Sequence, residues 1–480
     1  MAQRYVSRHS GTFDGVHIEY TAIVEGLRVR AANGAGIGRS YTTSYLADEP
    51  SPDRPITFVF NGGPGVSSVW LHLGGLGPFR AVIPTTLDTG ILPPYELAPS
   101  PSSLLGSSDV VFIDPINTGY GRADAGADTG AVDGVEGDAD HVADVIRRWL
   151  ERHGRLGARV FLLGESYGTI RAAVVATRLL GADNAIAVDG VALLGQVLNA
   201  QETTQRPGNV IGFVAAVPLL AVTASYHGLG THTGLGLDEL AEQAHAWSIG
   251  RYASALLQGT ALPEAELRSV AEELSGYSGL PVAGLLRCRL RVNKEDFRRE
   301  LLAERGLVLG LTDARYTSAA VPPGGSEPQF EPTGLHLDAA FVAAAQRHFT
   351  ENLGVPASKR YRLADNRTHE RWNYQESAAV SGFGGSPLPS PFALFDYAAH
   401  LRAYLRAVPG PIVHRHRALR HTHHGRLRAQ PACPERSAGR SDHLAHLPGR
   451  SHDVHRPWQC RNARRRAARL RRRPALSPRP

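Results

Sequence analysis

The stretch from Gly164 to Thr169 constrains the fold of this chain more than any other. Four apolar residues with strand character, Val160–Leu163, precede it, and the residues from Tyr167 to Leu180 have helical spacing. The stretch therefore predicts a strand, a sharp turn and a helix, with Ser166 at the apex. Its pattern is Gly-x-Ser-x-Gly, in which small residues let strand and helix approach closely. Such a turn exposes the hydroxyl as a nucleophile, and the alternative is an ordinary strand–helix junction with a serine cap.

The flanking sequence predicts a mostly parallel sheet. The expected core elements are the strands Ile56–Phe60 and Val110–Asp114, a helix over about 135–153 and a strand around Val188–Leu194. Strands that alternate with helices in this way are typical of a parallel sheet with helices on both faces. Ahead of them, residues 13–47 alternate in polarity and predict antiparallel strands, with turns near Glu25-Gly26 and Asn33-Gly34.

After residue 200 the strand signal fades and helical patterns take over. Helices are expected at Leu237–Trp247, Glu264–Leu274, Lys294–Glu304, Phe341–Thr350 and Phe392–Val408, and a last strand should begin at Pro411-Ile412-Val413. These patterns divide the chain into a first part of the core (1–200), a helical insertion (201–345), a second part of the core (346–410) and a tail (411–480). The chain is therefore expected to be an α/β protein with a helical insertion beside its sheet.

A glycine-rich segment follows the first buried strand. Phe60 leads directly into Asn61-Gly62-Gly63-Pro64-Gly65-Val66-Ser67-Ser68. A glycine-rich turn at the carboxyl end of a strand lets backbone N–H groups face a cavity, which is how an oxyanion hole is formed. The alternative is a loop that cradles phosphates, but the lysine of a P-loop is missing.

Three motifs are more specific together than any one of them alone. They are the segment Asn61–Ser68, then Asp114-Pro115-x-x-Thr118-Gly119-Tyr120, then Gly164–Gly168. Together they resemble the serine carboxypeptidase family, a branch of the α/β-hydrolase fold, and the likeness covers about residues 12–410. The resemblance implies a mostly parallel central sheet flanked by helices, with residues 201–345 as an inserted helical cap. It implies no cofactor and no metal.

The resemblance also assigns roles to six residues. It implies that Ser166 is the nucleophile and that the backbone N–H groups of Gly63 and Tyr167 form the oxyanion hole. It places Asn61, Gly62 and Glu165 at the substrate, with Asn61 and Glu165 on its terminal carboxylate. A glutamate must be protonated to donate a hydrogen bond to a carboxylate, so tight binding is expected at acid pH. The alternative for Glu165 is a structural hydrogen bond to the glycine-rich loop.

This chain departs from the family pattern at two positions near the motifs. Val66 stands where the family has a cysteine, so a disulfide is absent. Gly75 stands where the family has a second carboxylate-binding glutamate, fourteen positions after Asn61. The second departure keeps an esterase or acyltransferase on the same scaffold open as an alternative to a carboxypeptidase.

The net charge of +7 conceals a break in composition. Residues 411–480 carry a net charge of +15, with 18 arginines and no lysine, whereas residues 1–410 carry −8. A basic tail of this kind is typical of a nucleic-acid-binding arm, of a disordered tail, or of translation in the wrong frame. No run of about 18 apolar residues predicts a membrane span, and Met1–Glu25 has no unbroken apolar stretch typical of a signal peptide. We therefore expect a cytoplasmic protein.

The acid and base that a serine nucleophile needs are missing from the tail. In α/β-hydrolases an Asp and then a His follow the Ser, here after about residue 410, and the family's Gly-x-x-Asp and Gly-His do not appear. Residues 416–424 and 447–458 can, however, be encoded so that a shift of one nucleotide gives Thr-Gly-Leu-Tyr-Asp and Ala-Gly-His. Both shifts are in the same frame and in the right order. The sequence therefore favours a frameshift, with the Asp codon across Arg420/His421 and the His codon across Ser451/His452.

The expected function is release of C-terminal residues from peptides through an acyl-Ser166 intermediate. Without the Asp and His, the chain as it stands is expected to be nearly inactive. The non-enzyme alternative is an inactive relative, or a binding protein that uses the basic tail. The expected partner is a peptide substrate, with neither nucleic acid nor membrane expected, and the sequence does not indicate an oligomeric state.

Overall fold

In a computed structural model, the protein is described for residues 4–31, 34–51, 53–83, 93–200, 204–232, 234–321, 331–374, 396–408 and 412–415. Its centre is a nine-stranded sheet in the order β1-β2-β3-β7-β4-β9-β10-β13, with β8 (Arg122–Ala123) beside β3. The path runs through β1 (Arg4–Phe13), β2 (Val16–Arg30), β3 (Gly36–Ala47), β7 (Asp109–Asp114), β4 (Ile56–Phe60), β9 (Val160–Glu165), β10 (Gly190–Leu194) and β13 (Ile412–Arg415).

The two halves of this sheet differ in direction. The first strands pair antiparallel up to β7, and the strands from β7 to β13 are all parallel. The predicted strands and the last sheet strand at residue 412 are thus confirmed. Parallel strands bring their carboxyl ends to one edge, where the loops after β4 and β9 meet.

One predicted turn is wrong. Glu25 and Gly26 lie inside β2, and the hairpin turns instead at Asp14-Gly15. A Cβ atom on Gly26 would lie 3.1 Å from the Tyr41 ring on β3, so this glycine makes room for an aromatic ring rather than for a turn. The second turn is confirmed at Gly34, whose φ of 82° needs a glycine-like conformation, while Asn33 lies outside the described residues.

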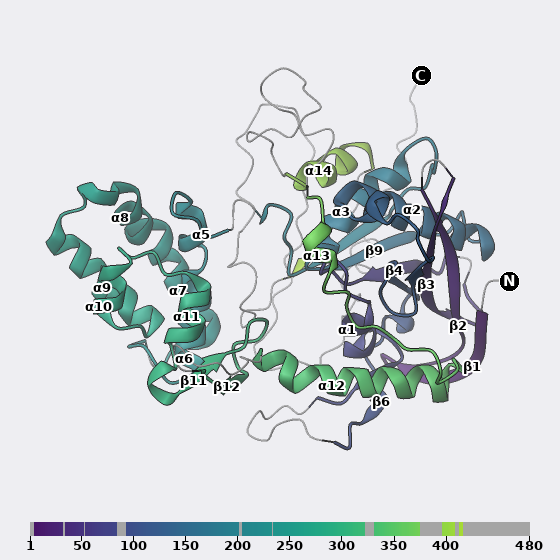
Figure 1. The fold of residues 1–480 in the computed structure, drawn as a ribbon, viewed down its shortest axis with the longest axis horizontal. Helices are drawn as coiled ribbons and strands as arrows, with labels where there is room; N and C mark the ends of the chain where they lie inside the picture. Colours follow the sequence, from purple (N-terminus) through teal and green to yellow (C-terminus); the bar gives the residue numbers. More distant parts are fainter. Residues whose placement is uncertain are drawn as a thin grey trace, which may run out of the picture.

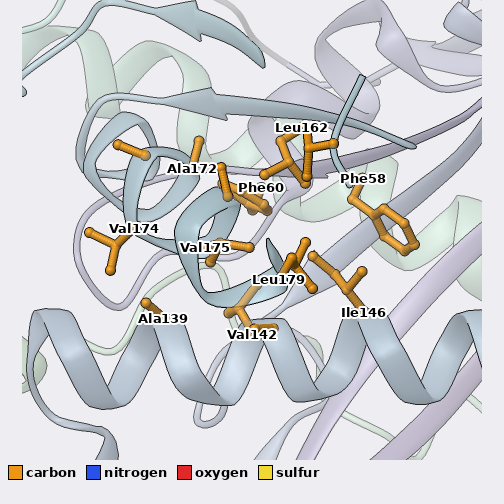
Figure 2. Packing of buried hydrophobic residues seen from close by; sticks show 14 of the residues in the cluster. Phe58, Phe60, Ala139, Val142, Ile146, Leu162, Ala172, Val174, Val175 and Leu179 are labelled. Carbon is orange, nitrogen blue, oxygen red and sulfur yellow. The ribbon is translucent and has the colours of Figure 1, made fainter. Parts of the chain in front are cut away.

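Helices cover both faces of the sheet (Figure 1). The predicted amphipathic helix is α2 (Val135–Arg152), and the helix after the serine is α3 (Tyr167–Leu180), with the bounds that the sequence predicted. Figure 2 shows α2 and α3 packing their apolar side chains against Phe58 and Phe60 of β4 and Leu162 of β9. On the other face lies α12 (Pro332–Arg347), which extends the predicted helix toward its N-terminus, followed by the π-helical turn η7 (His348–Asn352).

Residues 204–321 form a group of helices beside the sheet (Figure 1). They are α5 (Val210–Val214), α6 (Val217–Tyr226), α7 (Leu237–Trp247), α8 (Ala253–Gln258), α9 (Glu264–Ser278), α10 (Val282–Arg287) and α11 (Lys294–Glu300). These helices enclose an apolar core of their own, which includes Leu220, Val270 and Phe297. The predicted helix at 294–304 ends earlier, at Glu300.

The chain returns to the sheet through α13 (Thr368–Arg371) and α14 (Ala398–Ala407), which packs on α3. Short elements complete the fold: α1 (Val69–Leu71), the π-helical turn η1 (His72–Leu76), β5 (Phe79–Ala81), β6 (Leu97–Pro99), β11 (Leu307–Leu309) and β12 (Thr317–Ala319). Residues 392–395 and, apart from 412–415, the tail after 408 lie outside the described residues. Across the described ranges, no helix is long and apolar enough to cross a membrane.

Candidate active site

Ser166 lies at the apex of a strained turn between β9 and α3. Its φ and ψ are 57° and −125°, a region that non-glycine residues seldom occupy and that costs about 1–3 kcal/mol. The backbone holds this conformation from both sides, because the Ser166 N–H donates to Leu194 O (2.9 Å) and its carbonyl accepts from Thr169 Oγ1 (2.7 Å). The Ser166 side chain makes no capping hydrogen bond to α3 and is half-buried. It therefore does not act as an ordinary serine cap.

The glycine-rich loop packs directly on this turn. A Cβ atom on Gly62 would lie 2.4 Å from the Tyr167 nitrogen, and one on Gly168 would lie 2.9 Å from Phe60 O. Gly63 has a φ of 103° and remains half-buried, like Ser166. The structure thus brings the glycines of the loop and the backbone of Tyr167 together beside the serine, where the sequence predicted them.

Asn61 and Glu165 are in direct contact. Asn61 Nδ2 donates to Glu165 Oε2 (3.1 Å), and Asn61 Oδ1 accepts from the Leu71 N–H (3.1 Å). Asn61 is only 2% exposed, whereas Glu165 is half-buried. The hydrogen bond between them is the structural role that the sequence left open.

A segment distant in sequence covers the other side of the loop. The Ser67 N–H donates to Leu363 O (2.8 Å), the Asp365 N–H donates to Gly65 O (2.8 Å), and Val66 forms a bridge with Ala364. Backbone pairing with residues 363–365 thus fixes the loop at the position where the family pattern has a cysteine.

Asp114, from the second motif, anchors the same loop from within. Its carboxylate accepts hydrogen bonds from the N–H and Oγ of Ser68 and from the Tyr361 hydroxyl (2.9 Å). Burial raises the pKa of Asp114, although these hydrogen bonds oppose the shift. Because Asp114 is 3% exposed and fully engaged, the second motif is structural.

Comparison with known proteins agrees with these motifs. Residues 41–212 match the family model for serine carboxypeptidases. This part of the chain is similar to the serine carboxypeptidases. Serine carboxypeptidase-like 44 of Arabidopsis thaliana is 30% identical over 214 residues, which cover 42% of this chain and 38% of the relative. Serine carboxypeptidase-like 51 of the same plant is 30% identical over 130 residues, 27% of this chain and 25% of the relative. The chain thus matches about a quarter to two fifths of the length of these relatives.

Among solved structures, the prohormone-processing carboxypeptidase Kex1Δp of Saccharomyces cerevisiae is similar over 82% of this chain and 73% of its own, with 15% identity and a TM-score of 0.44. A proline iminopeptidase of Mycobacterium smegmatis covers 56% of this chain and 71% of its own, with 13% identity and a TM-score of 0.26. The parallel strand order, the serine turn after β9 and the family match make this an α/β-hydrolase fold.

A serine carboxypeptidase needs a histidine at its serine. Among the described residues, no histidine hydrogen-bonds to Ser166, and the buried ones have other partners: His141 with Ser40, and His72 and His348 with Tyr45. The predicted Asp and His positions, after residue 410, lie outside the described residues. Strand β13 pairs in parallel with β10, so the chain leaves β13 at the edge where Ser166 lies. No cluster of metal-binding side chains occurs in the described ranges.

The sequence did not identify two buried charged residues beneath the serine turn. Asp138 on α2 and Arg171 on α3 are 2% and 1% exposed and form an ion pair of 2.7 Å. Asp138 lies in the first turn of α2, where a negative charge suits the helix macrodipole and does not by itself indicate a partner. The signal that identifies Arg171 is its place among the apolar residues 170–176 of α3, since a charge on a fully buried helix face needs a partner.

Proposed function

We propose that this scaffold is that of a serine-type carboxypeptidase, which releases C-terminal residues from peptides by acyl transfer through Ser166. The observation that carries the proposal is the strained Ser166 turn with the Gly62–Gly63 loop packed against the Tyr167 nitrogen. The family match supports the same chemistry.

In this mechanism the Ser166 Oγ attacks the carbonyl carbon of the last peptide bond. The hydroxyl proton passes to a base and then to the nitrogen of the departing amino acid, and water later hydrolyses the ester on Ser166. The N–H groups of Gly63 and Tyr167 would stabilise the oxyanion, and Asn61 and Glu165 would bind the terminal carboxylate. The base must come from the residues after β13, in the restored reading frame.

An esterase or acyltransferase is the second candidate, and a feature at Gly75 favours it. Gly75 has a φ of 125° and a ψ of −6°, so a glutamate at this position would be strained. The backbone conformation of η1 therefore disfavours the second carboxylate-binding glutamate at position 75. Release of the last residue of a blocked dipeptide, compared with hydrolysis of a simple ester, distinguishes the two activities.

A fluorophosphonate probe tests the nucleophile. We expect it to label the protein whose reading frame is shifted by one nucleotide near codons 410–416, called the frame-restored chain below. Labelling should occur at Ser166 and disappear in Ser166→Ala. Labelling at a different serine would overturn the assignment. A protein that instead binds nucleic acid through 411–480 would lose that affinity steeply with salt and on removal of the tail.

A further inference from the structure

One side chain connects the two backbone segments of the proposed oxyanion hole. Arg171 Nη1 donates to the carbonyl oxygen of Asn61 (2.6 Å), directly before the Gly62–Gly63 pair. The same guanidinium donates through Nε (2.7 Å) and Nη2 (3.1 Å) to the two oxygens of Asp138. Asp138 in turn accepts a hydrogen bond from the Tyr167 hydroxyl (3.1 Å). All four residues are at most 3% exposed.

Packing restricts the guanidinium further. Its carbon Cζ lies 5.5 Å from the ring centre of Phe60 and 5.2 Å from that of Tyr167. Burial disfavours its charge, but the carboxylate of Asp138 outweighs this, so the pKa of Arg171 is raised and the guanidinium stays charged. A buried ion pair is weak evidence for stability, because desolvation offsets most of its attraction. A planar guanidinium that binds a carboxylate and a backbone carbonyl at the same time is, in contrast, well suited to fixing the relative positions of the two groups.

We infer that Arg171, held by Asp138, is a positioning residue that sets the glycine-rich loop at the distance from Tyr167 that the oxyanion requires. It does not touch the substrate. The inference rests on the proposed function for its catalytic consequence, but the positioning of the loop is measurable without catalysis. A shift of about 1 Å in such a loop costs about 100-fold in rate.

The chain offers a matched control at the opposite end of the sheet. Arg155 Nη1 donates to Asp109 Oδ2 (2.8 Å) and its Nη2 donates to the carbonyl oxygen of Arg54 (2.9 Å). It therefore also joins a buried carboxylate to a backbone carbonyl, far from the serine turn. Its side chain is 22% exposed, against 1% for Arg171, so the variants are compared per folded molecule.

Hydrogen exchange on the frame-restored chain tests the positioning. Lysine keeps the charge but cannot reproduce the fork, so Arg171→Lys should increase exchange by about 10-fold or more at the amides of Val66, Ser67 and Ser68, which are hydrogen-bonded in the native loop. Arg155→Lys should leave these amides unchanged. Asp138→Asn, which keeps the size of the side chain, should show the same pattern as Arg171→Lys. Equal effects of Arg171→Lys and Arg155→Lys on this loop, or no effect of either, would overturn the inference.

Kinetics on the frame-restored chain provide the second readout. Arg171→Lys should lower kcat by about 10–100-fold with KM within about twofold, because the oxyanion contacts form mainly in the transition state. Arg155→Lys should leave both constants unchanged. An unchanged kcat in Arg171→Lys would also overturn the inference. If Ser166→Ala retains full hydrolysis, the proposed function fails, while the exchange result still decides the role of Arg171.

Discussion

At the scale of single residues, the serine turn depends on glycines, because their lack of a side chain lets strand and helix approach. Gly164 lies in β9 directly under the start of α3, and a Cβ atom there would lie 2.0 Å from the carbonyl oxygen of Gly168. Backbone atoms cannot move aside as the end of a flexible side chain can. The glycines of the motif therefore allow strand and helix to approach, and the strain at Ser166 is maintained by this packing.

The first prediction concerns this close approach. Gly164→Ala should destabilise the frame-restored chain by about 1–3 kcal/mol or more, because the added methyl group has to displace backbone. Urea unfolding measures the change. Gly157→Ala is the control, since a Cβ atom there meets nothing within 4 Å. Equal stability of the two variants would show that the turn is not tightly packed.

A second prediction concerns Glu165. A glutamine at 165 can donate a hydrogen bond to a carboxylate at any pH, whereas the glutamate must first take up a proton. Glu165→Gln should therefore shift the pH optimum for peptides upward and leave simple esters, which lack the terminal carboxylate, unchanged. Rate profiles for both substrate types measure this. A peptide profile that does not move would leave Glu165 with its structural bond to Asn61 only.

The residues of the serine turn and its loop could be predicted because each motif is local in sequence. The turn and the loop lie side by side because they follow β4 and β9, two parallel strands that pair directly. Arg171 could not be assigned in the same way, because its partner Asp138 lies on a different helix and a sequence does not show which charges pair. Val66 and Ala364 likewise form a β-bridge between segments that are far apart in the sequence, so only the structure shows their pairing.

At the scale of elements, the sequence predicted segments with a clear period and missed those without one. Helix α3 has the predicted bounds, since its strand, turn and helix are marked by glycines. Helix α6 was missed because almost all its residues are buried, from Val217 to Ala224, so it has no polar face. The sequence predicts a turn at Gly26 because a glycine in a strand does not reveal whether it bends the chain or makes room for a ring.

A buried hydroxyl joins three elements on the far face of the sheet. The Tyr45 hydroxyl of β3 lies 2.7 Å from Nε2 of His72 in η1 and 2.7 Å from Nε2 of His348 in η7. The hydroxyl has one hydrogen to donate, so it can donate to one Nε2 and accept from the Nε2–H of the other ring, and two neutral rings can supply these two roles. Burial lowers the pKa of His348 to about 3, and burial together with the neighbouring His348 lowers the pKa of His72 well below its usual range.

A third prediction follows for the dependence of stability on pH. Burial also lowers the pKa of His141 to about 4. The histidines of the unfolded chain take up protons near pH 6.5, whereas the buried histidines of the folded chain do not. The free energy of unfolding is therefore highest above about pH 6.5 and falls as the pH drops toward 4. Each such histidine costs about 2 kcal/mol at about pH 5.

Urea midpoints of the frame-restored chain between about pH 7.5 and about pH 5 measure this loss. The variant His141→Gln removes one of the titrating groups and should show a shallower slope. A midpoint that does not change with pH would mean that the buried histidines are protonated in the folded state. The expected loss limits how far an acid optimum for peptide binding can extend.

At the scale of the whole molecule, the change of composition coincides with the end of the sheet. The last described strand, β13, is four residues long and pairs only with β10 among the described strands. Immediately after it begins the arginine-rich sequence whose net charge opposes that of the rest of the chain. In an α/β-hydrolase this is where the Asp and His of the triad should follow.

The last prediction concerns the chain as it stands. Loss of a triad member typically costs about 10⁴–10⁶ in turnover, and the histidines buried in the described residues are hydrogen-bonded to Ser40 and Tyr45 rather than to Ser166. Stability should suffer as well, because a segment out of frame cannot cover the sheet edge beyond β13, and an uncovered edge favours aggregation. We therefore expect this chain to be nearly inactive and prone to aggregate, and the frame-restored chain to be soluble and to hydrolyse substrates through Ser166. Sedimentation and rate measurements on the two proteins, with Ser166→Ala as the control, check both points. If the chain as it stands proves soluble and fully active, a histidine of the tail serves as the base and the reading frame is correct.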